Sequence, residues 1–251
     1  MVRLARDVTA ATAVRSALVL APHPDDETLG CGATILRKVA AGATVTLVVV
    51  TDGRHSHRGA GIGPGGLAEL RRGELAEAAK RLRLPAGAVR WAGFEDGALS
   101  AREPDLTRAV QHLVDELRPD EVYATSALEP HPDHAALGRA ARAAAGPAVL
   151  FEYPVWLWRS WPLQRGARLR STVDAAVRVA GRGAVKVRTG EYLAGKLHAL
   201  DAHDSQLRRP ARLPDSVPWA VLPQSVLDAA AAPAELFFLA HRDASLRSPS
   251  R

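Results

Sequence analysis

The sequence predicts an α/β protein with a doubly wound, mostly parallel sheet and a smaller C-terminal α+β lobe. Three observations predict it. Short apolar runs alternate with segments of helical periodicity between residues 16 and 154. One of these runs, 43–51, is rich in apolar and β-branched residues throughout, which is typical of a strand buried on both faces. The chain has 251 residues, 47% of them hydrophobic and 24% charged, so it is long enough to bury a full core.

The N-terminal elements follow from local patterns. The first predicted strand is 16–21, a short apolar run that ends at a proline. A helix is predicted over 28–41, where apolar residues recur at helical spacing until Gly42. The run 43–51 is the second strand. The segment 54–66 is rich in glycine and is predicted to be a loop, with the length of a candidate lid or substrate-binding loop.

The alternation continues in the middle of the chain. An amphipathic helix is predicted over 67–84, with leucine and alanine on one face and arginine and glutamate on the other. Further elements are expected at strand 88–94, helix 105–117, strand 121–125, helix 133–145 and strand 148–153. Successive strand–helix–strand units form right-handed parallel crossovers, so we expect helices on both faces of a Rossmann-like sheet.

After Pro154 the alternation weakens. The remaining candidates are short strands near 172–179 and 184–187, a helix over 192–207 and a last apolar run at 236–240. We expect these segments to form a lobe that is folded onto the sheet, over the functional site, rather than an independent domain. The chain is therefore predicted to be one domain over 1–251, with a core at about 16–154 and the lobe at about 155–245.

Composition narrows the class of protein. The formal charge is +6, which could attract an anionic partner, but no dense Lys/Arg run or nucleic-acid motif is present, so we expect no nucleic-acid binding. The single cysteine, Cys31, excludes an internal disulfide framework. No stretch approaches the roughly 18 apolar residues of a transmembrane helix, and residues 1–15 do not resemble a secretory signal. We expect a cytoplasmic enzyme; its oligomeric state is not readable, and a homo-oligomer is possible.

Two short clusters combine imidazoles and carboxylates beside a proline. Pro22-His23-Pro24-Asp25-Asp26-Glu27 follows the first predicted strand, and His131-Pro132-Asp133-His134 follows the fourth. Histidine and aspartate suit Zn²⁺, and three protein ligands with one open position are typical of a catalytic zinc site. Ligands of open α/β sheets bind beyond the carboxyl ends of the strands. The two clusters are therefore predicted to meet in one site for metal-assisted hydrolysis.

The two clusters resemble the motifs of the zinc-dependent N-acetylglucosaminyl deacetylases, the LmbE-like or PIG-L-like family. Both the His-Pro-Asp-Asp-Glu and the His-Pro-Asp-His elements are intact. Weaker matches are Arg71-x-x-Glu74, the segment 94–97 and the segment 196–206, so the resemblance covers about 18–206. It implies an N-deacetylase that hydrolyses a linear C–N bond and releases acetate and a free amine.

The resemblance also implies a ligand set. His23, Asp26 and His134 would bind Zn²⁺, although the ligands alone do not distinguish Zn²⁺ from Fe²⁺. Two imidazoles and one carboxylate leave the site near +1, which is enough to acidify a water. Spacing alone leaves open that His131 is the ligand and His134 is not.

Catalytic roles follow from the same resemblance. Asp25 matches the general base, although an aspartate at this place could instead only cap the next helix. His131 matches the residue that stabilises the oxyanion and protonates the leaving amine. We expect the Asp133 carboxylate to orient the His131 ring and to raise its pKa. Glu27 is expected to support the turn.

Other residues have weaker assignments. Arg71 resembles a substrate contact, or else lies on a solvated helix face. His55 and His57 could close over a substrate, and His203 resembles a position near the site. A tryptophan cluster could stack on sugar rings or pack in the lobe; it comprises Trp156, Trp158 and Trp161.

The expected partner is a small-molecule N-acetylated amino-sugar conjugate. The sequence does not name the conjugate, because specificity belongs to variable segments such as 54–66 and the C-terminal lobe. Two alternatives remain open: an amidase that cleaves a larger amide with the same metal site, and a non-catalytic metal- or sugar-binding protein. Asp25 argues against the second, since binding a metal does not need a base.

Overall fold

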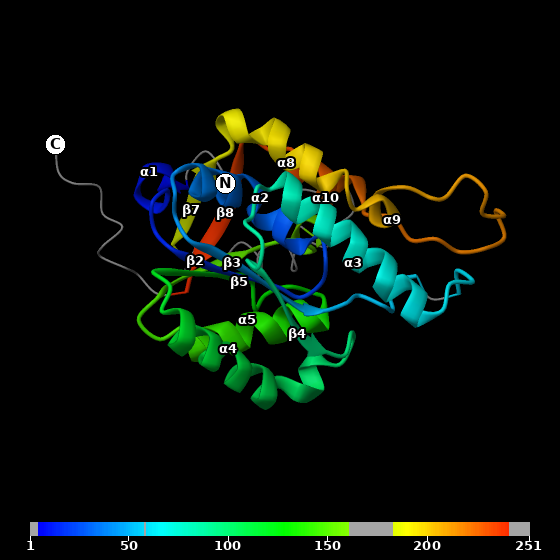
Figure 1. The fold of residues 1–251 in the computed structure, drawn as a ribbon, viewed down its shortest axis with the longest axis horizontal. Coiled ribbons are helices and arrows are strands. Elements are labelled where there is room, and N and C mark those ends of the chain that lie inside the picture. Colours follow the sequence, from blue (N-terminus) through cyan, green and yellow to red (C-terminus); the bar gives the residue numbers. More distant parts are fainter. Residues whose placement is uncertain (1–4, 58, 161–182, 241–251) are drawn as a thin grey trace.

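The computed structural model describes residues 5–57, 59–160 and 183–240, and within them one eight-stranded sheet organises the chain (Figure 1). The strand order is β1-β7-β8-β6-β5-β2-β3-β4. The strands are β1 Arg6–Asp7, β2 Ala17–Ala21, β3 Val45–Thr51, β4 Val89–Phe94, β5 Glu121–Thr125, β6 Val149–Tyr153, β7 Ala184–Arg188 and β8 Ala234–Leu239. The predicted α/β class is confirmed.

The order in which successive strands are added to the sheet reverses next to β2. Strand β2 pairs in parallel with β3 on one side and with β5 on the other. From β2 the chain proceeds outward through β3 and β4, and from β5 it proceeds in the opposite direction to β6. The carboxyl ends of β2 and β5 therefore form a topological switch point, the place where open α/β sheets bind ligands.

Helices cover both faces of the sheet. Alternate residues of β2 belong to two cores: Val19 packs with residues of α2, α3, α8 and α10, and Leu18 packs with residues of α4 and α5. Figure 1 shows α4 and α5 on one side of the sheet and α2, α3, α8 and α10 on the other. The helices are α1 Thr9–Thr12, α2 Asp26–Ala40, α3 Pro64–Arg81, η1 Leu99–Arg102, α4 Glu103–Leu117, α5 Pro132–Ala144, α6 Leu157–Ser160, η2 Gly190–Tyr192, α8 Leu193–Leu200, α9 Asp204–Leu207 and α10 Gln224–Ala230.

The predicted elements between 16 and 154 are all present, with ends shifted by up to three residues. The prediction that the C-terminal strands belong to a lobe folded onto the sheet is wrong, because β7 and β8 are strands of the same sheet. Strand β8 inserts between β6 and β7 and is antiparallel to both. The predicted helix over 192–207 is not continuous: it ends at Leu200 and resumes at Asp204, because a turn brings His203 into the interior. The predicted strand near 172–179 lies outside the described residues.

Buried lysines connect α2 and α8 to the sheet. Lys38 of α2 donates to Glu121 Oε2 over 2.6 Å and to the carbonyl oxygens of Thr12 and Arg15. Lys196 of α8 donates to Glu235 Oε1 over 2.8 Å. Because Lys196 also donates to the Leu29 carbonyl oxygen of α2, both lysines hold α2, whose first turn includes Asp26 and Glu27 of the first cluster. In the part of the chain that the structure describes, no helix combines the length and apolar character needed to cross a bilayer.

Candidate active site

Both predicted clusters meet at the carboxyl ends of β2 and β5. His23 follows β2, Asp26 begins α2, and His134 lies in the first turn of α5. His23 Nδ1 is 3.2 Å from His134 Nε2, and Asp26 Oδ2 is 3.3 Å from each of these nitrogen atoms. Zinc bound tetrahedrally at about 2.05 Å requires its ligand atoms to be about 3.3 Å apart. The three atoms therefore fit a divalent cation.

The potential ligand atoms of a second group, His23, His131 and Asp133, also lie within 4.8 Å of one another, but the Asp133 carboxylate and one ring nitrogen of His131 already accept backbone hydrogen bonds. The Asp133 carboxylate accepts hydrogen bonds from the backbone N–H groups of Gly97 and Leu99, over 2.7 and 3.1 Å. Ring atom Nδ1 of His131 accepts from the backbone N–H of Asp133. This geometry favours His134 over His131 as the third ligand.

Two further carboxylates face the outer nitrogen atoms of the ligand rings. Asp96 Oδ1 is 3.0 Å from His23 Nε2, and Glu129 Oε2 is 3.5 Å from His134 Nδ1. Burial opposes ionisation of Asp96, but hydrogen bonds from His23 and from the His55 N–H lower the pKa of its carboxyl. A carboxylate on the outer nitrogen fixes the tautomer and orientation of a metal-binding histidine. Asp96 lies in the 94–97 segment that contributes to the family resemblance but had no role assigned from it, and Glu129 was not predicted, although each closely follows a strand end at this edge.

Replacing Asp96 with Ala is expected to weaken metal binding about 10- to 100-fold, because His23 Nε2 loses the nearer of its two carboxylate neighbours and keeps only Asp133 Oδ2 at 3.5 Å. Competition with a metallochromic chelator would measure the affinity. Asp96→Asn is the matched control, since its amide oxygen can still accept from His23 Nε2. Equal metal affinity for Asp96→Ala and wild type would contradict this role.

Asp25 has an unusual backbone conformation. Its φ is 110°, a value that residues other than glycine rarely adopt. Holding aspartate in this conformation costs about 1–3 kcal/mol. Its carbonyl oxygen accepts from Leu29 N–H over 2.9 Å, and its own N–H donates to Glu27 Oε2 over 3.1 Å. Its side chain makes no capping hydrogen bond with α2, so the interpretation of Asp25 as only a helix cap is wrong. Burial raises the pKa of Asp25 to about 7, against the opposing charge of Arg71.

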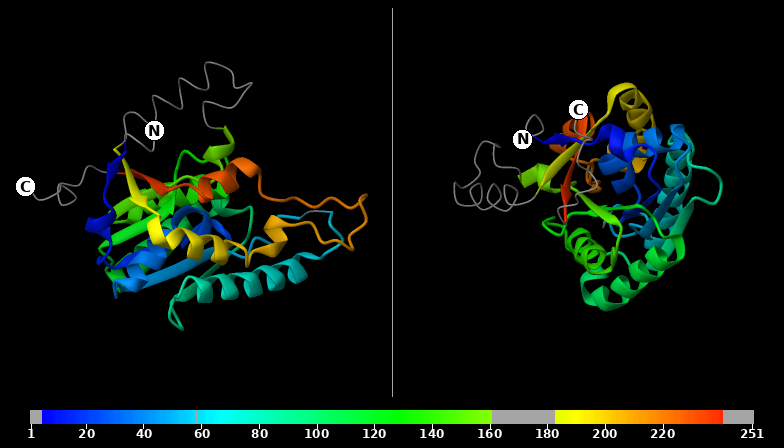
Figure 2. Two further views of the ribbon diagram at one scale, coloured as in Figure 1. Left: turned by 90° about the horizontal axis from the view of Figure 1, so that it is seen from above. Right: turned by 90° about the vertical axis from the view of Figure 1, so that its left-hand side faces the viewer.

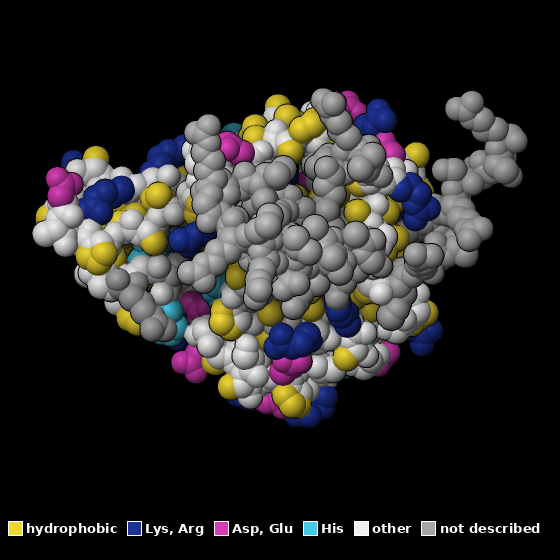
Figure 3. Space-filling view, turned by 180° about the vertical axis from the view of Figure 1, so that it is seen from behind, with side chains coloured by type: hydrophobic (Ala, Val, Ile, Leu, Met, Phe, Trp, Pro, Cys, Tyr) yellow, Lys and Arg dark blue, Asp and Glu magenta, His cyan; other side chains and the backbone are white. Residues whose placement is uncertain are grey.

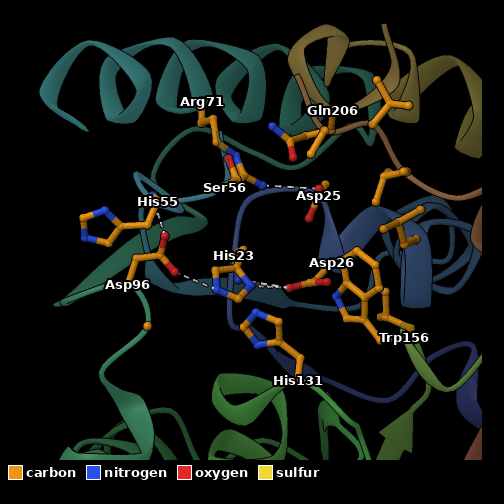
Figure 4. A pocket seen from close by; sticks show the side chains of 16 residues that line it. His23, Asp25, Asp26, His55, Ser56, Arg71, Asp96, His131, Trp156 and Gln206 are labelled. Carbon is orange, nitrogen blue, oxygen red and sulfur yellow. Dashed lines mark hydrogen bonds and ion pairs between the residues drawn. The ribbon is translucent and has the colours of Figure 1, made fainter. Parts of the chain in front are cut away.

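Arg71 of α3 is 3% exposed, so it does not lie on a solvated helix face. Its Nη2 contacts Asp25 Oδ2 over 3.2 Å and also the Pro24 carbonyl oxygen, while Nη1 donates to the Gly53 carbonyl oxygen over 3.1 Å. Figure 4 shows Arg71 and Asp25 on the same side of the His23–Asp26 pair. The guanidinium therefore holds the Asp25 side chain in place.

His131 lies on the opposite side of that pair (Figure 4), with its ring centroid 5.0 Å from that of His23. Burial, together with the neighbouring His134 and His23 rings, lowers the pKa of His131 to about 4. The expectation that the Asp133 carboxylate orients this ring is wrong, and although its charge acts to raise the pKa of His131, burial and the two neighbouring rings outweigh it. The carboxylate is turned toward the N–H groups of Gly97 and Leu99, and only the backbone of Asp133 contacts the ring.

These residues border a cavity of about 390 Å³. On the face drawn in Figure 3, histidine and acidic side chains lie together in a hollow of the surface. Trp156 lines the cavity, whereas Trp158 packs elsewhere and donates to the Pro154 carbonyl oxygen; Trp161 lies outside the described residues. The lining residues are His23, Asp25, Asp26, Leu29, His55, Ser56, Arg71, Asp96, Gly97, His131, Val155, Trp156, Gln206, Ala220, Val221 and Leu222.

Comparison with known proteins places this site in a family. The family model described as PIG-L, GlcNAc-PI de-N-acetylase, matches residues 18–145, which include both clusters. This chain belongs to the PIG-L family.

Individual relatives agree with that membership. A 1D-myo-inositol 2-acetamido-2-deoxy-alpha-D-glucopyranoside deacetylase 2 of Saccharopolyspora erythraea is 34% identical; the match covers 57% of this chain and 61% of that protein. A probable N-acetyl-alpha-D-glucosaminyl L-malate deacetylase 2 of Bacillus anthracis is 31% identical, with 76% and 81% covered. The crystal structure of the A40926 pseudoaglycone deacetylase superposes with a TM-score of 0.66 at 20% identity. The match covers 90% of this chain and 97% of that protein, which shows the shared fold.

The region beyond the PIG-L match adds one wall of the cavity. Ser205 anchors this wall: its N–H and hydroxyl group donate to Glu74 of α3, each over 2.7 Å. Its carbonyl oxygen is 3.0 Å from both His57 Nε2 and Trp219 Nε1, whose rings are in contact. Figure 2 shows the loop containing His57 and the 208–223 segment projecting side by side.

A buried histidine supports the first cluster from the same region. His203 Nε2 is 3.3 Å from Glu27 Oε1, and Glu27 in turn accepts the backbone N–H of Asp25. Glu27 thus supports the turn, as the sequence predicts. His57 is buried against Ser205, whereas His55 lines the cavity.

Proposed function

We propose that this protein is a metal-dependent N-deacetylase that removes the acetyl group from an N-acetylglucosamine unit of a glycoconjugate. The observation that carries the proposal is the near-equilateral arrangement of the His23, Asp26 and His134 ligand atoms beside the Asp25 carboxylate. The names of the relatives, deacetylases of glucosaminyl conjugates, support the substrate class. In this assignment His23, Asp26 and His134 hold Zn²⁺, with Fe²⁺ as the alternative ion.

A bound divalent cation would supply a Lewis acid that polarises the acetyl carbonyl and acidifies water. Asp25 then acts as the general base. Arg71 and the strained turn direct its carboxylate into the cavity, next to the metal ligands but outside their triangle. From there Asp25 accepts a proton from the attacking water and delivers it to the nitrogen as the C–N bond breaks.

His131 acts as the hydrogen-bond donor to the oxyanion that develops on the acetyl oxygen. Because its Nδ1 accepts the backbone N–H of Asp133, the proton of the neutral ring resides on Nε2. Asp133 is therefore a positioning residue, which also connects α5 to the 97–99 turn through its carboxylate. Arg71 is assigned to hold Asp25 rather than to contact the substrate.

Two alternatives predict different behaviour. An amidase for larger conjugates would use the same groups but release no amine from simple acetylated sugars, and a non-catalytic binding protein would release none from any compound. The buried, strained Asp25 favours an enzyme over a binding protein, because ligand binding alone does not require it. The cytoplasmic location and a homo-oligomeric state stay predictions from the sequence.

Primary-amine release from a panel of N-acetylglucosaminyl compounds tests the proposal. We expect release by the metal-loaded protein, loss of activity after dialysis against a chelator, and recovery after addition of Zn²⁺ or Fe²⁺. The same panel with N-butanoyl in place of N-acetyl groups separates deacetylation from general amidase activity. Release that is unaffected by complete metal removal would contradict the assignment of the site.

A further inference from the structure

The cavity has two chemically different ends. Histidine and aspartate side chains lie at the end that includes His23 and Asp96. Apart from Ser56, Arg71 and Gln206, the remaining lining is mostly apolar and is called the apolar end here: Leu29, Val155 and Trp156 come from α2 and the segment after β6, and Ala220, Val221 and Leu222 come from the wall anchored at Ser205. Figure 4 shows Trp156 on the side of the cavity opposite Asp96 and His55.

Trp156 of the apolar end lies next to His131 of the end where the reaction would take place. The indole ring of Trp156 is nearly parallel to the His131 ring, at an angle of 24° and a centroid distance of 6.4 Å. A sugar held with its acetyl group near His23 and His131 would thus lie beside Trp156, in a cavity that Val221 also borders. Val221 is 47% exposed, which is unusual for a large apolar side chain unless a ligand or partner covers it.

The described lining offers no free cation for an acidic ligand. Arg71 is the one arginine or lysine among the described residues that border the cavity, and its guanidinium is bound to Asp25 and to two carbonyl oxygens. The carboxylates of Asp25, Asp26 and Asp96 also border the cavity. An anionic group on the substrate would meet these carboxylates at one end and apolar side chains at the other, so both ends disfavour it.

We propose that the aglycone, the group attached to the anomeric carbon of the sugar, is apolar in the substrate of this protein and binds between Trp156 and the 220–222 wall. This inference rests on the proposed deacetylase function and names its substrate class: aryl or alkyl glycosides of N-acetylglucosamine. It separates this chain from the two relatives named above, whose names specify inositol and malate conjugates.

Calorimetric binding of deacetylated glycosides to the full-length, zinc-loaded protein tests the inference without turnover. The probes are methyl, butyl, hexyl, phenyl and malyl glucosaminides. We expect the Kd to fall about fourfold for each methylene group that becomes buried, phenyl to bind more tightly than methyl, and malyl to bind more weakly than methyl. Equal Kd values for methyl and hexyl, or tightest binding of malyl, would overturn the inference.

Variants identify the surface responsible. Val221→Asp is expected to reduce the hexyl-to-methyl affinity ratio at least tenfold, because it places a charge at the apolar end. Trp156→Leu, which keeps an apolar side chain, should lower the phenyl-to-methyl ratio and provides a second test if Val221→Asp is unstable. Val14→Asp is the matched control, since Val14 is 71% exposed and does not line the cavity. An unchanged hexyl-to-methyl ratio in a folded Val221→Asp protein would overturn the assignment.

Amine release from the corresponding N-acetyl compounds distinguishes the two proposals. Preferential binding of hexyl and phenyl glycosides without amine release from any of them would support the apolar subsite and contradict the deacetylase function. Amine release with no dependence on the aglycone would support the deacetylase function and contradict the apolar subsite.

Discussion

Asp25→Asn is expected to lower kcat for amine release about 10²- to 10⁴-fold, the usual range for loss of a general base. The amide cannot accept the proton of the attacking water, but it keeps the shape of the carboxylate and an oxygen that can accept from Arg71. Asparagine is also a suitable replacement because it tolerates positive φ better than alanine does, and Asp25 has φ 110°. Rates at saturating substrate and metal content by mass spectrometry would be measured together.

Metal content is the internal control for that variant. Because Asp25 lies outside the His23–Asp26–His134 triangle, the variant should retain about one metal ion per chain. Asp105→Asn, which removes a surface carboxylate of α4, should keep the wild-type rate. A folded, metal-loaded Asp25→Asn protein with wild-type kcat would show that another group accepts the proton.

Lys38→Met is expected to destabilise the fold by about 3–5 kcal/mol, because it leaves the buried Glu121 carboxylate without its main cation. Burial lowers the pKa of Lys38 and raises that of Glu121, the two directions that loss of solvent imposes on such a pair. Arg15 lies 3.4 Å from Glu121 Oε1 but is partly exposed, so it compensates incompletely. Urea unfolding followed by circular dichroism would measure the change.

The matched control is Lys80→Met. Lys80 is also a helical lysine with a glutamate neighbour, but its side chain is 83% exposed and 4.0 Å from Glu77. Its replacement should change the free energy of unfolding by less than about 0.5 kcal/mol. The double variant Lys38→Met/Glu121→Gln should recover part of the lost stability, since it removes the unpaired charge. Equal stability of Lys38→Met and Lys80→Met would contradict the argument.

Features of the fold that arise from local patterns could be predicted from the sequence. The apolar run 43–51 and the periodic segment 28–41 became β3 and α2 with small shifts at their ends. The position of β8 could not be predicted, because an apolar run of that length does not specify which strands it pairs with. Its insertion between β6 and β7 is set by long-range packing.

The same distinction applies to the candidate site. Each of the two clusters is contiguous in sequence, so the residue types alone indicate a metal site. The carboxylate that faces His23 Nε2 is Asp96, 73 residues away, and the histidine that faces Glu27 is His203, 176 residues away. Such pairs are brought together only by the folded chain. The role of Asp133 depends on a side-chain direction, which spacing does not determine.

The loop between Gln206 and Leu222 is closed by a main-chain hydrogen bond at its ends and attached to the rest of the protein by the side chains of Arg208 and Trp219. The Leu222 N–H donates to the Gln206 carbonyl oxygen over 2.8 Å, and the Ser205 carbonyl oxygen accepts from His57 and Trp219. Carbonyl oxygens are present whatever the side chain, and surface loops tolerate changes of length. Mutations in this loop that keep Arg208 and Trp219 would therefore change one wall of the cavity while the residues proposed as metal ligands stay unchanged, so that the wall and the candidate metal site can vary separately within one chain.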